Sequence, residues 1–307
     1  MKRFRINPVY KKELKVSTRT IKLALTILAY NGLLALIGLI AFYAIFQNAR
    51  YGGIDYEDVL TLYMVLAGME FGMILFVIPA YTSSAISGER ERQTLEILLT
   101  TSMKPIQIIW GKLLSSISTV LLLVFSSLPV LSLVFTIGGV SVGDLAKYVI
   151  MVVVTAVFAG SLGLLFSASF KRTTISTVFT YGAMVMIGAG TIVLLAIIYL
   201  LLQQYYDVQF DIGNYTQYRQ VDLGFGMCLL YINPGVTIVS LLVDQFAGTG
   251  EFTEVIEEFG TLPKFFTTHW FWISLCVQTG ISAWILWLAA RVLNPLREKK
   301  AKRKKNR

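Results

Sequence analysis

The chain alternates between long apolar stretches and short segments that hold its charges. A helix needs about 20 mostly apolar residues to cross the hydrocarbon core of a bilayer, and six stretches meet this requirement clearly. They are Leu23–Phe46, Leu60–Ile86, Leu113–Ile137, Leu145–Phe170, Thr177–Leu202 and Trp270–Leu293. The pattern predicts an all-α polytopic membrane protein, with one transmembrane domain over residues 1–307 and six transmembrane helices.

Composition agrees with lipid as the main solvent of the chain. Hydrophobic residues make up 55% of it and charged residues only 15%, against about 25% charged residues in an average soluble domain. The first apolar stretch is too long for the apolar part of a cleaved signal peptide. Two cysteines and one histidine are too few for a disulfide framework or for a His-pair metal site within this chain. We therefore expect no cofactor or metal on this chain.

A seventh apolar stretch, Leu223–Val243, is long enough to span, and the charges decide against it. Lys and Arg concentrate on the cytoplasmic side of membrane proteins. With six spans, both chain ends share one side with all but four of the 27 basic residues; the exceptions are Arg50, Lys147, Arg219 and Lys264. A seventh span would move the basic tail to the other side. We therefore expect six spans in the plasma membrane with both termini cytoplasmic.

Asn233, Pro234 and Gly235 interrupt the seventh stretch, and Pro and Gly end helices. We expect a re-entrant turn here, with two short helices inside an extracellular loop over residues 203–268. Such irregular backbone is tolerated at membrane depth only where protein or water covers it. The loop also collects acidic residues: Asp207, Asp211, Asp222, Asp244, Glu251, Glu254, Glu257 and Glu258.

Both ends of the chain are basic. Residues 1–22 contain Asn7 and Pro8, which predict a helix N-cap and first turn, followed by a mixture of basic and apolar residues. This indicates a short helix lying in the membrane interface. The tail, residues 294–307, is expected to contact anionic membrane lipids, not nucleic acid, because such lipids attract basic clusters at about 1 kcal/mol per residue.

The segment 87–112 lies between two predicted spans, and it is too long and too structured to be a tight connection. Leu95, Leu98 and Leu99 share one helical face, and the residues 100–102 break that helix. Ser102 is then expected to cap a second helix that has Pro105 in its first turn. We predict a cytoplasmic helical hairpin with an apolar rib and charged flanks, suited to a groove on a partner. A solvated loop helix fits the same periodicity.

The sequence of this segment, from Gly88 to Thr101, closely resembles the hallmark of the type-2 permeases of ABC transporters. That motif reads roughly I-x-G-E-R-E-x-G-T-L-E-x-L-L-x-T-P, and a Gly-Lys pair follows it before the third span, as Gly111-Lys112 does here. Gln93 stands where Gly is usual, and Ser102 where Pro often stands. Weaker likenesses are the segments 7–14, 163–172 and 294–296.

The resemblance implies a function and partners. Two permease chains, identical or related, would enclose a translocation path, and the hairpin would be the coupling helix seated on a separate ATPase subunit that holds ATP and Mg²⁺. Export dominates in this family. The residues expected to couple to the ATPase are Gly88, Glu89, Arg90, Glu91, Arg92, Thr94, Leu95, Glu96, Leu98 and Leu99. The chain itself lacks a Walker A loop, so we expect that it is not an enzyme.

Glu70 is the only acidic residue deep inside a predicted span. A charge at the bilayer centre costs about 2.5–3.5 kcal/mol on insertion scales, so Glu70 is either a pathway residue or a hydrogen-bonded contact between helices. Two other functions stay open. One is a non-transporting sensor or scaffold subunit that uses the same hairpin. The other is a membrane-embedded enzyme, which would need a polar constellation that the spans do not show. The sequence does not identify the cargo.

Overall fold

The computed structural model describes residues 7–18, 20–49, 56–100, 103–137, 141–211, 221–246, 248 and 250–294. Every regular element in these ranges is a helix, and six helical segments within them are long and apolar enough to cross a membrane. They are Ile21–Gln47, Leu60–Glu91, Pro105–Pro129, Val142–Ser169, Thr173–Tyr206 and Trp270–Val292. The predicted all-α polytopic fold with six spans is confirmed. The chain forms two compact units, Met1–Gly182 with Thr279–Arg307, and Ala183–Gln278.

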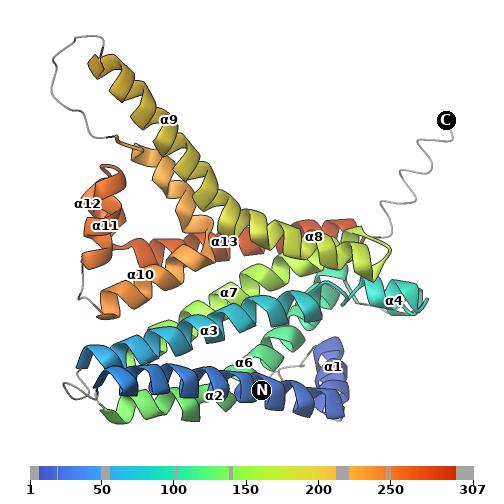
Figure 1. Ribbon diagram of the computed structural model, residues 1–307. Coiled ribbons are helices and arrows are strands. Elements are labelled where there is room, and N and C mark those ends of the chain that lie inside the picture. Colours follow the sequence, from blue (N-terminus) through green and yellow to red (C-terminus); the bar gives the residue numbers. More distant parts are fainter. Residues whose placement is uncertain are drawn as a thin grey trace, which may run out of the picture. The chain divides into compact units, whose positions relative to one another are not determined.

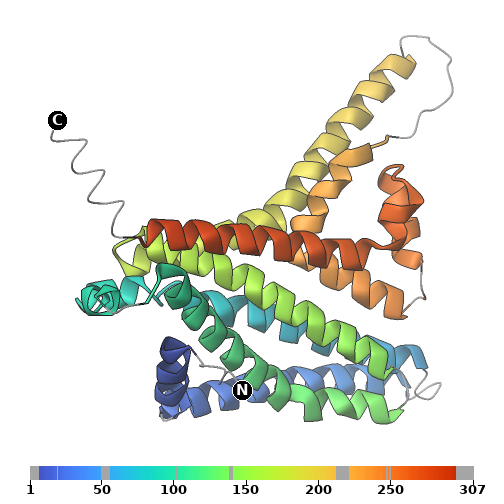
Figure 2. The same cartoon turned by 180° about the vertical axis from the view of Figure 1, so that it is seen from behind.

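The first unit is built around α3 (Tyr56–Thr82), which packs against α2 (Ile21–Ala49), α6 (Pro105–Ile137) and α7 (Val142–Ser169). Figures 1 and 2 show these four helices side by side. The short helix α1 (Pro8–Thr18) packs on α6. As predicted, Asn7 caps α1, because its Oδ1 accepts a hydrogen bond of 3.0 Å from the Val9 amide.

The predicted end of a helix before residues 100–102 and the predicted start of the next helix at Pro105 agree with the structure, but the first part of the segment is divided further than predicted. Its first part is two short helices, α4 (Ser87–Glu91) and α5 (Leu95–Leu99), and its second part is the beginning of α6, which runs from Pro105 to Ile137 without a break. Ser102, the predicted cap, lies outside the described residues.

A left-handed residue separates α4 from α5. Gln93 has a φ of 59°, the Gln93 amide donates to the Arg90 carbonyl at 3.1 Å, and the Thr94 amide donates to the Glu89 carbonyl at 2.9 Å. These two bonds form a Schellman motif, in which the left-handed position favours Gly. The geometry therefore suits the Gly that stands at this position in the motif that the segment resembles, where this chain has Gln93.

The apolar rib of the segment contacts its own chain. Leu95 is buried in a cluster with residues of α6, α7 and the end of α13 (Trp270–Val292), and Leu99 packs against this cluster. The Leu98 side chain lies outside the described residues. Four neighbouring side chains are exposed: Arg92, Gln93, Thr94 and Glu96.

The second unit contains the π-helix η1 (Met186–Gly190), which follows α8 (Thr173–Val185) and continues into α9 (Thr191–Asp211). A 3-10 helix, η2 (Gly224–Ile232), meets α10 (Pro234–Phe246) at a bend of 100°. The predicted break at Asn233, Pro234 and Gly235 is confirmed, whereas a return to the same membrane face stays a prediction. The short helices α11 (Glu251–Phe259) and α12 (Lys264–Thr268) follow.

Candidate functional site

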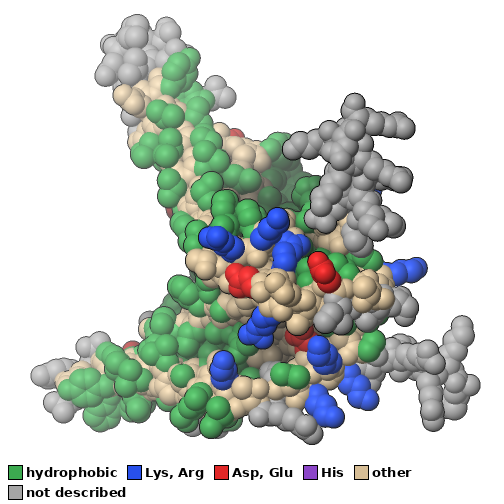
Figure 3. Space-filling view, turned by 90° about the vertical axis from the view of Figure 1, so that its right-hand side faces the viewer, with side chains coloured by type: hydrophobic (Ala, Val, Ile, Leu, Met, Phe, Trp, Pro, Cys, Tyr) green, Lys and Arg blue, Asp and Glu red, His purple; other side chains and the backbone are tan. Residues whose placement is uncertain are grey.

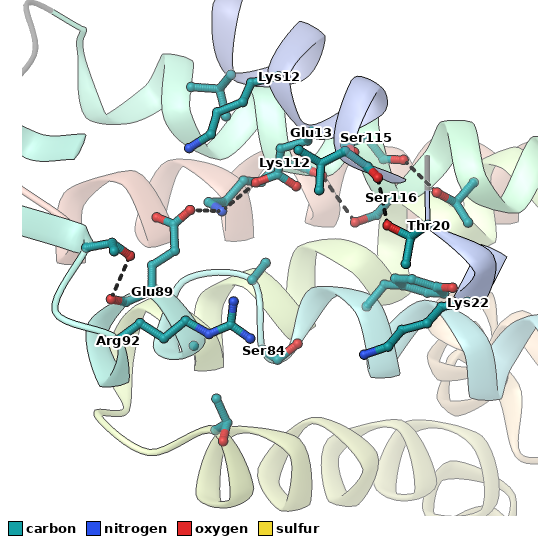
Figure 4. A pocket seen from close by; sticks show the side chains of 18 of the residues that line it. Lys12, Glu13, Thr20, Lys22, Ser84, Glu89, Arg92, Lys112, Ser115 and Ser116 are labelled. Carbon is teal, nitrogen blue, oxygen red and sulfur yellow. Dashed lines mark hydrogen bonds and ion pairs between the residues drawn. The ribbon is translucent and has the colours of Figure 1, made fainter. Parts of the chain in front are cut away.

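Lys112, on α6, is the centre of an ion-pair junction. Its side chain is 2% exposed, and its Nζ lies 2.8 Å from Glu13 Oε1 and 2.9 Å from Glu89 Oε1. Figure 4 shows the three side chains meeting between α1, α4 and α6. A buried ammonium group is tolerated only when carboxylates and hydrogen bonds compensate its lost hydration. The two contacts therefore connect α1, α4 and α6.

Gly111 allows α1 to approach α6 at this point. A Cβ atom at Gly111 would lie 2.9 Å from the Val9 Cβ and 3.1 Å from the amide atoms of the Asn7 side chain. Asn7 Nδ2 also donates to the Gln107 carbonyl at 2.6 Å. The Gly-Lys pair thus has two structural uses, because Gly111 permits the close contact with α1 and Lys112 binds the α1 carboxylate.

Arg90 binds the carboxyl end of α7. Its two terminal guanidinium nitrogens donate to the carbonyls of Ala168 and Phe170, each at 3.1 Å. The last carbonyls of a helix lack partners within the helix and carry its partial negative charge. Arg90 therefore satisfies both the hydrogen-bonding needs and the electrostatics of this helix end.

Glu91, the next residue, binds the amino end of α8. Its carboxylate accepts from the Thr173 amide at 2.8 Å and from the Thr173 hydroxyl at 3.0 Å and 3.2 Å. The first amides of a helix are free donors with partial positive charge. Consecutive residues of opposite charge thus hold both sides of the turn between α7 and α8.

Gly163 and Ser167 on α7 hold the connection between α3 and α4. Ser167 Oγ accepts from the amides of Ile86 at 2.8 Å and Ser87 at 3.0 Å. A Cβ atom at Gly163 would overlap the Thr82 hydroxyl, so only Gly admits this approach. The segment 163–172, which the sequence singled out only weakly, therefore belongs to the same site.

We name as the junction the six residues Glu13, Glu89, Arg90, Glu91, Lys112 and Ser167. Of the ten predicted coupling residues, Glu89, Arg90 and Glu91 bind other elements of the chain, and Leu95 is buried. The remaining polar members, Arg92, Thr94 and Glu96, are exposed, and a Cβ atom at Gly88 would lie 3.6 Å from the Thr173 methyl group. A coupling role for all ten stays a prediction.

Sequence reasoning did not identify Glu13 and Lys112 as site residues. Both lie in segments that it had quoted for their family likeness, 7–14 and 111–112. The signal that could have indicated Lys112 is a lone basic residue followed directly by an apolar span. No pattern along the chain indicates that Glu13 and Lys112 meet, because 99 residues separate them.

Glu70, the candidate pathway residue, is fully buried at the meeting point of four helices. Its carboxylate accepts from Tyr30 Oη on α2 at 3.3 Å, from Tyr148 Oη on α7 at 3.0 Å and from the Ser127 hydroxyl on α6. These donors are hydroxyl groups, which satisfy a carboxyl group at low cost in an apolar setting. In this arrangement Glu70 connects helices, and a role in the pathway stays a prediction.

Asn233 holds the break in the second unit. Its Oδ1 accepts from the Gly235 amide at 2.8 Å, and its Nδ2 donates to the Gly188 carbonyl at 2.7 Å and to Thr191 Oγ1 at 2.9 Å. Gly188 lies in the π-helix, where the regular hydrogen-bond ladder is disturbed. The neutral side-chain amide of Asn233 therefore provides hydrogen-bond partners for backbone groups at two helix interruptions, the Gly188 carbonyl and the Gly235 amide.

Comparison with known proteins assigns the family. The sequence profile described as "ABC-2 family transporter protein" matches residues 8–288, from the first residue of α1 to a point within α13. No curated protein matches the chain. The profile covers both units and all the residues of the junction. The chain therefore belongs to the ABC-2 family, as a membrane permease component of an ABC transporter.

Proposed function

We propose that this chain forms the path of an ATP-driven exporter, and that a separate ATPase subunit docks on the exposed side chains within residues 93–96, which are Gln93, Thr94 and Glu96. The observation that carries the proposal is the position of the junction. Glu89, Arg90 and Glu91 immediately precede the exposed turn and bind α6, α7 and α8. A force applied to the turn is therefore applied to three long helices.

The contacts suit the transmission of such a force. Charge-assisted hydrogen bonds are shorter and about twice as strong as neutral ones, and they hold a fixed direction. Leu95 adds a buried apolar anchor from the same segment to α6 and α7. The segment thus moves as one body with the helix ends that it binds, whereas the exposed side chains stay available to a partner.

The remaining parts of the proposal come from the family and from the charge pattern. A second permease chain, identical or related, completes the path. The ATPase subunit supplies ATP and Mg²⁺, so this chain carries no hydrolytic chemistry. The basic segments 1–22 and 294–307 support a cytoplasmic position for both termini, on the side where an ATPase would lie. Export follows the prevailing direction in the family.

Co-purification of the full chain with its ATPase tests the docking surface. We expect Glu96→Lys, which reverses an exposed charge, to release the ATPase, and Glu254→Lys, the same change on the exposed side of α11, to retain it. Glu91→Lys is unsuitable, because Glu91 holds α8. Equal ATPase retention by both variants would show that the docking surface lies elsewhere.

Glu89→Gln tests transmission separately from docking. This variant weakens the contact with Lys112 and leaves the exposed residues unchanged, so the ATPase should remain bound. ATP-dependent accumulation of the transported compound in inside-out vesicles should fall at least tenfold. ATPase binding in the wild type without accumulation of any compound, and without stimulation of ATP hydrolysis, would instead identify a sensor or scaffold subunit.

A further inference from the structure

A cavity of about 1120 Å³ lies beside the junction. Residues of α1, the beginning of α2, the end of α3, α4 and α6 line it, all within the first unit. Two apolar spans begin beside it, at Ile21 and Pro105, and a third ends beside it, at Glu91. The cavity therefore lies at the level where the membrane gives way to water.

Three cationic side chains from three different segments line the cavity. They are Lys12 on α1, Lys22 on α2 and Arg92 after α4. Figure 4 shows Lys22 and Arg92 extending toward one another across it, with Lys12 on the wall formed by α1. None of the three forms an ion pair with a carboxylate among the described residues. Figure 3 shows that Lys and Arg gather on this end of the unit.

The carboxylates of the cavity wall already have partners. Glu13 and Glu89 bind Lys112, and Glu91 binds the amino end of α8. The lining holds four cations, Lys12, Lys22, Arg92 and Lys112, against these three carboxylates, so the wall of the cavity has a net charge of +1. Convergent cations of this kind favour a phosphate group.

The cavity also has an apolar edge. Val16 and Leu23 line it, and on the neighbouring turns of α2 the side chains of Ile21 and Leu25 are 75% and 56% exposed. An apolar surface that continues from a cationic cavity along a membrane span suits a molecule with an anionic head and an apolar tail. A free phosphate or a nucleotide would leave this edge unused.

We propose that the cavity binds the phosphate group of an anionic phospholipid from the cytoplasmic leaflet. Lys12, Lys22 and Arg92 contact the phosphate, and an acyl chain lies along the first turns of α2. Because the three cations come from α1, α2 and the turn after α4, the bound lipid bridges these elements and holds the junction at a fixed depth in the membrane. The inference does not depend on ATPase docking.

Native mass spectrometry of the purified full chain, titrated with phosphatidylglycerol, tests the proposal. Removing one cation near an anionic lipid costs about fivefold in affinity, so Lys12→Gln and Lys22→Gln should each weaken binding of the first lipid by about that factor. The matched control is Lys11→Gln, an equal loss of charge at an exposed position of α1 that does not line the cavity. It should retain affinity within about twofold. Unfolding midpoints of all three variants confirm that they are folded.

Three results would overturn the proposal. Equal losses in Lys11→Gln and Lys12→Gln would indicate general attraction to basic residues. Equal binding of phosphatidylcholine would show that the cavity does not select an anionic head. Displacement of the lipid by inorganic phosphate at millimolar concentration would identify a soluble phosphate compound as the ligand. Neither Lys12 nor Lys22 lies in residues 93–96, so ATPase co-purification with these variants tests the docking surface independently.

Discussion

Two of the helix interruptions among the described residues are held by different chemistry. Between α3 and α6, the interruption is held by charges, with Lys112 between Glu13 and Glu89 and with Arg90 and Glu91 on two helix ends. Between η2 and α10, a single neutral side chain, Asn233, makes the connections. Both arrangements satisfy backbone or side-chain groups that a continuous helix would not expose.

The difference follows from the surroundings of each interruption. Glu13 and Glu89 keep 33% and 23% of their side-chain surface exposed, so water lowers the cost of their charges. Asn233 is fully buried in an uncharged apolar stretch, where an ion would cost several kcal/mol and a neutral amide costs little once it is fully hydrogen-bonded. The type of side chain that holds a helix break, charged or neutral, therefore depends on how polar the surroundings of the break are.

The largest expected effect comes from removing the central charge of the junction. Lys112→Met keeps the length and most of the volume of the side chain but leaves two carboxylates facing one another. Breaking a buried ion pair costs about 3–5 kcal/mol, and partial exposure of both partners reduces this to about 2–3 kcal/mol. The unfolding midpoint of the purified chain in detergent measures the loss.

Lys104→Met is the matched control, since Lys104 is exposed and forms no ion pair with the described residues. Its effect should stay within about 0.5 kcal/mol, as for most surface substitutions. Equal midpoints for the two variants would mean that the charges at the junction do not stabilise it.

The neutral interruption should respond to a different change. Asn233→Ala leaves the Gly188 carbonyl and the Gly235 amide without their partner and should cost about 2 kcal/mol. Asn233→Asp still accepts from Gly235 but cannot donate to Gly188, and it adds a buried charge. It should therefore be at least as destabilising as Ala, with faster hydrogen exchange over residues 186–191. A stable Asp variant would show that water reaches this break.

Local sequence signals predicted those parts of the structure that local physics determines. Six spans followed from apolar length, the start of α1 from Asn7 and Pro8, and the second interruption from Asn233, Pro234 and Gly235. The junction could not be predicted in this way, because its contacts join residues 23 to 99 positions apart. The hydroxyl neighbours of Glu70 come from three other helices, and no periodicity within one helix indicates them.

The sequence did not predict the split between α4 and α5, and the reason lies in the backbone. Helical periodicity continues through residues 91–99, and it does not show that one residue within this run adopts a left-handed conformation. The departure from the usual Gly of the family at Gln93 was visible in the sequence, but its meaning required the φ angle. A Gly that recurs in a motif between two helical segments is thus a better indicator of a helix end than the apolar pattern around it.

The smallest expected effect tests this backbone explanation. A residue with a Cβ atom pays about 1 kcal/mol in the left-handed region, and Gln93 is exposed, so its side chain makes no packing contact that would be lost. Gln93→Gly should therefore raise the free energy of unfolding by about 0.5–1 kcal/mol, after the greater freedom of Gly in the unfolded chain is subtracted. Gln93→Ala removes the same polar group but keeps the Cβ atom, so it should give no gain. Equal midpoints for Gly and Ala would show that the turn between α4 and α5 is not strained.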